Sequence, residues 1–598
     1  MKTFSLFASV SILLLACSVL SSPSATAAET NEAGRPNVIV IMSDDQGVGD
    51  YGFMGNPLIR TPSLDQMRTR SGYLSRFYVS NVCAPTRASL MTGRYNYRTR
   101  CIDTYVGRAM MDPDEVTLAE QLSEAGYQTG IFGKWHLGDN YPMRPMDQGF
   151  DESLIHRGGG IGQPSDPIGA EGKYTDPTLF HNGDEVAMEG YCTDIFFDAA
   201  INFARKQTES GKPFFSYIAT NAPHGPFDDV PQELYEEYKQ VDFSPILVND
   251  LPAKRRSAEF DKLARISAMI INIDQNVGKL FASLDKLGIR ENTIVLYLND
   301  NGPNSRRYVG NMRGNKTQVD DGGIRSPLLF HWPAKVDASD TTDVMLAHID
   351  LMPTLLDACG VAVPESAALD GKSFLPLLTG EMDDSQWETR SIAFQTHRGN
   401  VPQKFHHFAM HEHPWKLVHP SGFGKERFDG EPKFELYNLE EDPKQQNDLA
   451  DKHPEIVQRL KEAYSKWFDD VSSTRPDNYA PPRIVIGTEH EPQTVLTRQD
   501  WRHSSGRPWA KNSTGFWLLD APEEKRYEIE LILTDKDHRG GTATLHLNDE
   551  THTFEVAPGE RRGHFLEATI PAGPQTLSVT LADSINAGVH QVFLTTQD

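Results

Sequence analysis

The sequence predicts an α/β protein: a doubly wound, mostly parallel sheet, then a small α+β subdomain, then an added all-β, sandwich-like module. Three observations carry this prediction. Short, continuously apolar and β-branched runs, such as residues 37–42 and 292–298, are typical of strands buried on both faces of a sheet. Segments with helical periodicity separate these runs. After residue 482, apolar and polar residues alternate between Gly, Pro, Asn and Asp, as in antiparallel sheets.

The chain begins with a segment typical of exported proteins. Lys2 precedes an apolar run over residues 4–20, and small residues follow as far as Ala28. We therefore expect a signal peptide over residues 1–28 and a periplasmic or secreted protein. The run Leu-Leu-Ala-Cys that ends at Cys17 resembles a bacterial lipobox, so a lipid anchor at this cysteine is the alternative. No other run is long and apolar enough to cross a bilayer.

The balance of charges narrows the range of partners. Lys and Arg number 58 against 83 Asp and Glu, which gives a net charge of −25. This excess of acid argues against nucleic-acid binding through a basic face. An anionic substrate would need a few cationic side chains gathered in a cleft, because salt screens charges beyond roughly 10 Å.

Acidic and amide side chains follow two of the predicted strands. Asp44 and Asp45 come after the first apolar run, and Asp300 and Asn301 follow the run at 292–298. Neighbouring carboxylates at the end of a buried strand lose hydration and repel each other, so a cation is expected there. Four hard oxygen donors suit Ca²⁺ or Mg²⁺ and suit Zn²⁺ poorly. The plainer interpretation of either pair alone is a polar turn.

A cysteine stands at the start of the next helix-like segment. Cys83 precedes a run with Pro85 near its start, so its side chain is expected at the positive end of a helix dipole. Arg87 follows four residues later, on the same helical face, where the two side chains should meet. Taken alone, the segment also fits a buried cysteine beside a capped helix.

Cationic side chains follow two further apolar runs. Residues 128–132 lead to Lys134 and His136, which in an extended segment project to the same side. Residues 214–218 lead to a loop rich in Pro and Gly that is expected to hold His224 in place. A lone histidine is more often structural than catalytic, but these polar positions all fall at carboxyl ends of strands, where doubly wound sheets bind ligands.

Several of these segments resemble motifs of the sulfatase family. Cys-Ala-Pro-Thr-Arg, followed by Leu-Met-Thr-Gly-Arg, resembles the sulfatase signature, and Gly-Lys-Trp-His and Pro-His-Gly-Pro-Phe are similar to further sulfatase motifs. The stretch Arg-Gly-Asn-Lys ending at Lys316, with Gly-Gly-Ile-Arg-Ser-Pro after it, is similar to the segment whose lysine contacts the sulfate. The resemblance covers roughly residues 36–471.

The resemblance implies a reaction and a set of roles. In the family the signature cysteine is oxidised to formylglycine by a formylglycine-generating or sulfatase-maturing enzyme, its hydrated aldehyde is the nucleophile, and Ca²⁺ is the usual ion. We therefore expect sulfate ester hydrolysis, with a sulfated carbohydrate favoured as substrate. Carried over position by position, the expected metal ligands are Asp44, Asp45, Cys83, Asp300 and Asn301; the catalytic residues are Cys83, Arg87, His136 and His224; the substrate contacts are Lys134, His224 and Lys316.

Two features outside these motifs have open roles. Arg157, or His156 beside it, lies in a Gly-rich loop that in similar enzymes is near the substrate, where it would contact a sugar carboxylate or hydroxyl; an ordinary loop role is the alternative. With Cys83 assigned to chemistry, at most one disulfide forms among the three cysteines that remain in the exported chain, and the pair is open. Those three are Cys101, Cys192 and Cys359.

The changes in pattern along the chain suggest its domains. Helical periodicity marks residues 117–125, 193–205, 265–287 and 347–358. We expect a catalytic domain over 36–370, an α+β subdomain over 371–475 with a helix at 454–471, and a β-sandwich-like module over 483–598 beyond a Pro-rich break. In the module, tryptophans at three positions are expected mainly in the core, with stacking on sugar rings as the alternative. They are Trp501, Trp509 and Trp517.

Two rival functions fit the same sequence features. A phosphomonoesterase or phosphodiesterase of the related alkaline-phosphatase superfamily is similar in fold, but such relatives generally use Ser or Thr and two metals. A catalytically silent glycan-binding protein would keep Cys83 as a thiol and bind through the C-terminal module. The mass of a tryptic peptide containing position 83 separates the sulfatase from the binding protein.

Overall fold

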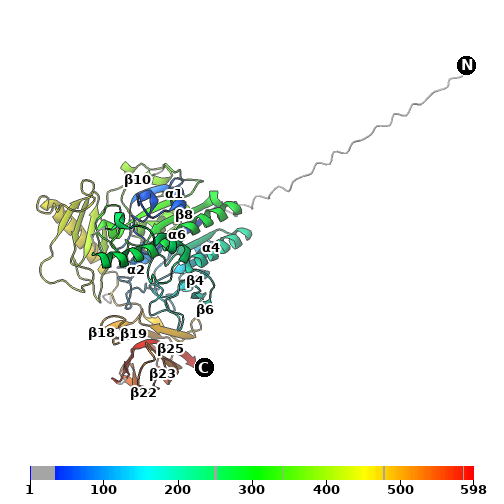
Figure 1. Cartoon of the computed structure of the whole chain (residues 1–598), viewed down its shortest axis with the longest axis vertical. Helices are drawn as coiled ribbons and strands as arrows, with labels where there is room; N and C mark the ends of the chain where they lie inside the picture. Colours follow the sequence, from blue (N-terminus) through cyan, green and yellow to red (C-terminus); the bar gives the residue numbers. More distant parts are fainter. Residues whose placement is uncertain (2–33, 248–251, 340, 476–478, 584, 598) are drawn as a thin grey trace.

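The computed structural model describes the chain except residues 2–33, 248–251, 340, 476–478, 584 and 598. The expected signal peptide and Cys17 therefore lie outside the described residues. Figure 1 shows three parts: a central region of strands between helices, a second sheet at one side of it, and a β module at the end that carries the C-terminus. Among the described residues, no helix has the length and apolar character needed to span a membrane.

The central sheet is mixed and mainly parallel in its middle. Its strand order is β10-β2-β9-β8-β1-β7-β3-β4-β5-β6, with β11 beside β2. Strand β1 pairs in parallel with β7 and β8, whereas β9 runs antiparallel to both β8 and β2. The bounds are β1 Asn37–Ser43, β2 Gly72–Tyr78, β3 Gln128–Lys134, β4 Glu152–His156, β5 Thr178–His181, β6 Asp184–Ala187, β7 Phe214–Ala219, β8 Thr293–Asn299, β9 Arg325–His331, β10 Thr341–Thr342 and β11 Leu346–Ala347.

The central sheet is buried on both faces, as its apolar strands predict. In β1 the side chains alternate between two core clusters: Val38, Val40 and Met42 belong to one, and Ile39 and Ile41 to the other. Helices cover the sheet, which confirms the expected α/β class. The helices of this part of the chain are α1 Pro62–Arg68, α2 Cys83–Thr92, α3 Leu118–Glu124, α4 Cys192–Glu209, α5 Gln232–Tyr238, α6 Ala253–Leu287, α7 Asp321–Ile324, α8 Leu351–Ala358 and α9 Leu375–Leu378.

Helix boundaries follow local chemistry in some places and packing in others. Helix α3 begins after Thr117, whose hydroxyl accepts from the Glu120 amide while the Glu120 carboxylate accepts from the Thr117 amide. Helix α6 starts at Ala253, well before the residue 265 expected from periodicity. Its first turns are mostly exposed, so the apolar pattern that marks the buried part is absent there.

A second, antiparallel sheet forms the subdomain that follows. It has the order β12-β13-β14-β15, with β12 Ile392–Gln395, β13 Phe408–Glu412, β14 Trp415–His419 and β15 Glu435–Asn438. Helix α10, Pro454–Ser472, packs on this sheet through an aromatic face that includes Tyr464 and Trp467. The helix predicted at residues 454–471 is confirmed.

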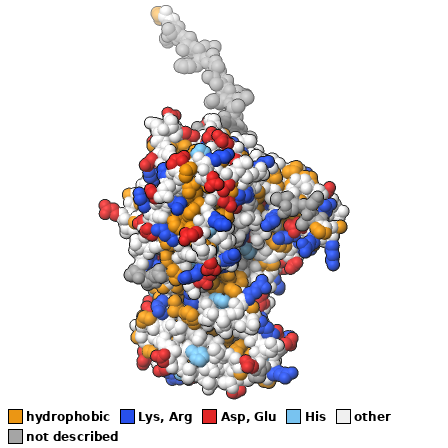
Figure 2. All heavy atoms as spheres, turned by 90° about the vertical axis from the view of Figure 1, so that its left-hand side faces the viewer, with side chains coloured by type: hydrophobic (Ala, Val, Ile, Leu, Met, Phe, Trp, Pro, Cys, Tyr) orange, Lys and Arg blue, Asp and Glu red, His pale blue; other side chains and the backbone are white. Residues whose placement is uncertain are grey.

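The C-terminal module, defined here by strands β16 to β25, consists of two packed sheets. Their orders are β16-β19-β24-β21-β22, with β18 beside β19, and β17-β25-β20-β23. In Figure 2 the module forms the smaller lobe below the part of the molecule built on the central sheet. The strands are β16 Ile484–Val485, β17 Gln493–Thr497, β18 Arg502–Ser505, β19 Thr514–Ala521, β20 Lys525–Leu533, β21 Gly541–Leu547, β22 Glu550–Val556, β23 His564–Ile570, β24 Gly573–Leu581 and β25 Val589–Gln597.

The core of the module continues into the central α/β part. Met110 and Met143 of the central α/β part belong to the same apolar cluster as Trp501 and Trp517, both about 1% exposed. The two tryptophans are therefore core residues. Trp509 is half-buried, and its ring meets that of Tyr105 edge-on at 5.2 Å. The module is thus joined to the catalytic part by a shared core as well as by the chain.

Candidate active site

Two adjacent strands bring the acidic pairs together. Because β1 and β8 are parallel neighbours, Asp44 and Asp45 leave the sheet beside Asp300 and Asn301. The amide of Asp45 donates to the Asp300 carboxylate at 3.2 Å, and the Asn301 side-chain amide donates to the Asp45 carboxylate at 2.8 Å. Asp45 has φ 62°, so the chain leaves the strand there and turns its side chain into the cluster.

Cys83 is the first residue of α2, at the edge of this cluster. Ligand atoms of Asp44, Cys83 and Asp300 all lie within 4.8 Å of one another. Every residue of α2 is buried. Burial raises the pKa of the Cys83 thiol, and the nearby cation of Lys134 opposes that shift.

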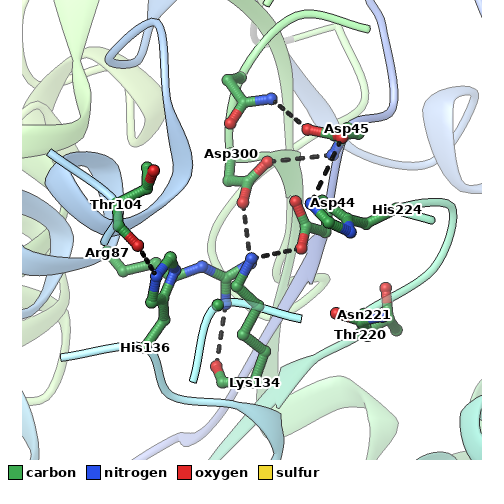
Figure 3. Close-up of polar contacts among 12 residues, drawn as sticks. Asp44, Asp45, Arg87, Thr104, Lys134, His136, Thr220, Asn221, His224 and Asp300 are labelled. Carbon is green, nitrogen blue, oxygen red and sulfur yellow. Dashed lines mark hydrogen bonds and ion pairs between the residues drawn. The ribbon is translucent and has the colours of Figure 1, made fainter. Parts of the chain in front are cut away.

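Arg87 connects α2 to the ends of two strands. Its guanidinium donates to the Asp300 carboxylate at 2.8 Å and to the carbonyl of Lys134 at 2.9 Å. Both side chains of the ion pair are fully buried. Figure 3 shows Arg87 directed at Asp300. Arg87 is thus part of the site, and its hydrogen bonds go to Asp300 and the β3 backbone.

Two lysines complete the charge cluster. Lys134, at the end of β3, donates to the Asp44 carboxylate at 2.5 Å, and Lys316 forms an ion pair with Asp45. Burial alone would raise the pKa of Asp44, but Lys134, with other nearby cations, holds it well below its usual range. Burial and the charge of Asp44 instead raise the pKa of Asp300. The two carboxylates thus shift in opposite directions, although both are fully buried.

The loop that carries Lys316 is held by backbone hydrogen bonds. The Thr317 amide donates to the Asn81 carbonyl at 2.8 Å. The Thr317 carbonyl accepts from the Asn81 side chain at 2.9 Å, and it lies 2.7 Å from Nε2 of His407. Because Asn81 precedes Cys83 by two residues, Lys316 is tied to the segment that leads into α2. His407 comes from the second sheet, so the subdomain also contributes to this arrangement.

The two predicted histidines lie on different sides of the cluster. His224 Nε2 is 3.9 Å from the Asp45 carboxylate, and this side chain is 17% exposed. His136 Nε2 is 2.7 Å from the carbonyl of Thr104. The segment that carries Lys134 and His136 was expected to be extended, but His136 has φ 63° and the chain turns after β3. Burial, with Lys134 adding to it, lowers the pKa of His136 well below its usual value.

The Gly-rich loop after β4 lies against both imidazoles. A Cβ on Gly159 would collide with the ring of His136, and one on Gly160 would come 3.0 Å from the ring of His224. Neither glycine has a left-handed φ, so the requirement is for space. In the same loop the Arg157 guanidinium lies 4.1 Å from the centroid of the Phe180 ring. His156 is buried, and its Nδ1 lies 3.1 Å from the Arg157 carbonyl.

The oxygens of the cluster are suited to a hard cation. Three buried atoms lack a hydrogen-bond partner among the described residues: Oδ1 of Asp44, Oδ2 of Asp45 and Oδ1 of Asn301. Buried oxygens without partners are costly unless something binds them. Carboxylate and amide oxygens are what Ca²⁺ and Mg²⁺ take. These residues therefore fit a divalent metal ion.

The four described cysteines are all unpaired and buried. The disulfide allowed by the sequence does not form among them. Other residues of the site carry no motif that sequence reasoning detects. Asn81 and Gln499 each donate a side-chain amide hydrogen to a backbone carbonyl, and Thr104 accepts through its own backbone carbonyl.

A doubly wound sheet with cations, carboxylates and a buried cysteine gathered at its carboxyl edge belongs to the class of α/β enzymes that act on anionic esters. Comparison with known proteins names the family within that class. The sulfatase family model matches residues 36–361, more than half of the 598 residues. The chain therefore belongs to the sulfatase family and is a sulfuric ester hydrolase. A second model, the C-terminal domain of N-sulphoglucosamine sulphohydrolase, matches residues 315–469.

Relatives and solved structures agree with this assignment. N-acetylgalactosamine-6-sulfatase from Canis lupus familiaris is 30% identical over 58% of this chain and 67% of its own. N-acetylglucosamine-6-O-sulfatase from Bacteroides thetaiotaomicron is 26% identical over 77% of this chain and 92% of its own. The solved structure of Ps i-CgsB in complex with k-i-k-neocarrahexaose is 27% identical, with a TM-score of 0.62 over 74% of this chain and 95% of its own.

Proposed function

We propose that this sulfatase removes sulfate from a sulfated carbohydrate, with position 83 as nucleophile after oxidation of the cysteine to formylglycine by a maturing enzyme. The observation that carries the proposal is the meeting of Cys83 with the carboxylates of Asp44 and Asp300, within 4.8 Å of one another. Curated relatives named as sulfatases of N-acetylgalactosamine and N-acetylglucosamine support a sugar substrate. So does the similarity to Ps i-CgsB, solved with a neocarrahexaose.

The proposed cation is Ca²⁺, with Mg²⁺ as the other hard ion that suits the ligands. Asp44, Asp45, Asp300 and Asn301 would hold it, together with the side chain at position 83. Bound there, the ion would supply positive charge beside the sulfuryl oxygens. The unpartnered oxygens of three of these residues support this assignment.

The oxidised side chain would supply two hydroxyls as an aldehyde hydrate, one to attack sulfur and one to release sulfate. Arg87, fixed between Asp300 and the β3 backbone, orients that side chain. Lys134 and Lys316 stabilise the charge on the sulfuryl oxygens once a substrate competes for them. His224, partly open to solvent, is the general acid for the leaving alcohol.

His136 is the proposed base for the second hydroxyl. Its Nε2 faces a backbone carbonyl, so the proton sits on that nitrogen and Nδ1 keeps its lone pair. Burial lowers the pKa of this imidazole, which keeps it neutral. Arg157, in the Gly-rich loop after β4, stacks on Phe180 and is the proposed contact to a polar group of the sugar.

We also propose that the protein is exported, as its first 28 residues suggest.

Mass analysis tests the proposal. A tryptic peptide containing position 83 should show the loss expected for conversion of a thiol to an aldehyde. The variant Cys83→Ser should fold and take up one sulfate on the introduced hydroxyl without sustained turnover, because a serine ester has no second hydroxyl to release it. Sustained turnover by that variant, or an unmodified thiol in active enzyme, would refute the scheme. Desulfation of defined sulfated oligosaccharides would then identify the sugar.

A further inference from the structure

The C-terminal module reaches the active site through the turn between β17 and β18, residues 498–501. The Gly107 amide donates to the Gln499 carbonyl at 2.9 Å. The Arg502 guanidinium donates to the Val106 carbonyl at 3.1 Å. A Cβ on Gly107 would lie 2.9 Å from the Asp500 carbonyl, so the two backbones are in close contact. The turn of the module thus lies directly on the loop that contains Thr104, Val106 and Gly107.

Gln499 continues from this contact to a histidine of the site. Its side chain is about 1% exposed, and its Nε2 donates to the Thr104 carbonyl at 2.8 Å. The same carbonyl lies 2.7 Å from Nε2 of His136. The two side-chain nitrogens are 3.3 Å apart. A carbonyl only accepts, so both nitrogens approach it as donors and together use both of its lone pairs.

This arrangement sets the protonation of the imidazole. With the proton of His136 on Nε2, the nitrogen left as an acceptor is Nδ1, which is buried and has no hydrogen-bond partner within the described residues. Which ring nitrogen is protonated depends on the hydrogen bond made by the other one. The position of the Thr104 carbonyl therefore decides where the imidazole lone pair points.

The loop around Thr104 is held from its other side as well. Arg398, from the subdomain of β12–β15, donates to the Asp103 carboxylate at 3.0 and 2.9 Å. Its guanidinium also lies 4.2 Å from the centroid of the Tyr105 ring. Held by the subdomain at Asp103 and by the module at Thr104 and Gly107, the loop has little freedom to shift. A rigid loop gives the imidazole one orientation.

We propose that Gln499 is a positioning residue for His136, so that the C-terminal module is part of the active site. The inference rests on the proposed function only for the role of His136. Gln499 does not contact the reacting atoms; it holds the carbonyl that holds the base. Loss of the side-chain donor would let the Thr104 carbonyl and the imidazole shift, and a displacement of about 1 Å costs up to about a hundredfold in rate.

A matched pair of variants tests the proposal. Gln499→Met removes the donor and keeps the length of the side chain. Gln591→Met is the control: Gln591 is also buried in the module, and its Nε2 donates to two backbone carbonyls of the catalytic part, Pro164 at 3.0 Å and Asp166 at 3.1 Å. We expect kcat to fall about tenfold to a hundredfold for Gln499→Met, with KM within about twofold of wild type. We expect Gln591→Met to stay within about threefold in kcat.

A second measurement uses the chain before cysteine oxidation and needs no activity. Hydrogen exchange of peptides that contain Thr104 to Arg108 should be faster in Gln499→Met than in wild type or Gln591→Met. Equal exchange and equal kcat in the two variants would overturn the proposal, because general docking of the module would then explain both contacts. If Gln499→Met does not fold, Gln499→Glu, which keeps the shape but presents a carboxylate without a donor, replaces it in both experiments.

The experiments distinguish failure of the proposed function from failure of the proposed role of Gln499. If Cys83→Ser takes up no sulfate, the proposed function fails, while the exchange comparison still decides the role of Gln499. If Cys83→Ser is sulfated, adding Gln499→Met should leave the rate of that first step within about twofold, because His136 acts after the alcohol has left. A tenfold loss in that first step would overturn the assignment of Gln499 to His136.

Discussion

The charged centre and the rim of the site are built by different means. At the centre, side chains bind side chains: Arg87 pairs with Asp300 at 2.8 Å, and Lys134 pairs with Asp44 at 2.5 Å. We call the residues around the two imidazoles the rim of the site. There Gln499 donates to a backbone carbonyl, that of Thr104, and Gly159 leaves space for the His136 ring because it has no side chain. The centre therefore depends on charge and the rim on shape. The expected effects of substitution differ accordingly.

The largest effect is expected from breaking the centre at its cation site. Asp300→Asn removes one carboxylate from the oxygen cluster and the partner of Arg87. Activity should fall at least about 10³-fold, since losing a single electrostatic contact already costs about 10² to 10³. Steady-state kinetics and metal content measure this. Chelation should abolish wild-type activity, and added Ca²⁺ should restore it.

Glu530→Gln serves as the control for this experiment, because Glu530 is a carboxylate of the module paired with Arg562 far from the oxygen cluster. Its activity should remain at the wild-type level. Wild-type activity that persists after complete removal of divalent ions would contradict the proposed cation site.

The next prediction concerns the free energy of unfolding. It compares the loss of a buried ion pair with the loss of one at the surface. Arg87→Met leaves the fully buried Asp300 carboxylate without its cation, which should cost about 3–5 kcal/mol. Arg562→Met breaks a pair of similar length, 2.9 Å, in which the arginine is 51% exposed, and should cost about 0–1 kcal/mol. Denaturant unfolding followed by tryptophan fluorescence measures both. Equal losses would show that the centre is no more dependent on its charges than the surface.

A smaller effect is expected where the rim depends on space. Gly159→Ala places a methyl group against the His136 ring, so kcat should fall about tenfold as the imidazole is displaced. Gly424→Ala is the control, because a Cβ there meets nothing within 4 Å and no left-handed φ is required. Kinetics with one substrate compare the two. An unchanged kcat for Gly159→Ala would show that the space beside the His136 ring is not needed for catalysis.

The smallest effect is expected at the outer edge of the rim. Arg157→Ala removes a guanidinium that stacks on Phe180 and forms no ion pair within the described residues. If Arg157 binds a polar group of the sugar, KM should rise about tenfold with kcat within about twofold, since one charged hydrogen bond is worth about 1.5 kcal/mol or more. The exposed Arg526 of β20 gives the control substitution. An unchanged KM would return Arg157 to an ordinary loop role.

Much of the central sheet followed from local sequence. The apolar runs at β1, β3, β7 and β8 were predicted because strands buried on both faces need continuous apolar residues. Strand β2 was missed, since Ser75 and Arg76 interrupt its pattern. Strand β9 was also missed, although its antiparallel pairing with β8 makes the sheet mixed. A short strand with polar interruptions has too weak a pattern to be recognised alone.

By itself, the sequence determined which side chains stand at the ends of strands: Asp44, Asp45, Asp300 and Asn301, with Cys83 at the start of a helix. Strand pattern and charge are local properties, so these positions are visible before folding. Only the tertiary structure decided that Thr104 presents its carbonyl to His136 and that Gln499, 395 residues further along the chain, meets the same oxygen. Every residue has a backbone carbonyl, so nothing in the letters marks this one; its role arises from the packing of the module on the catalytic part.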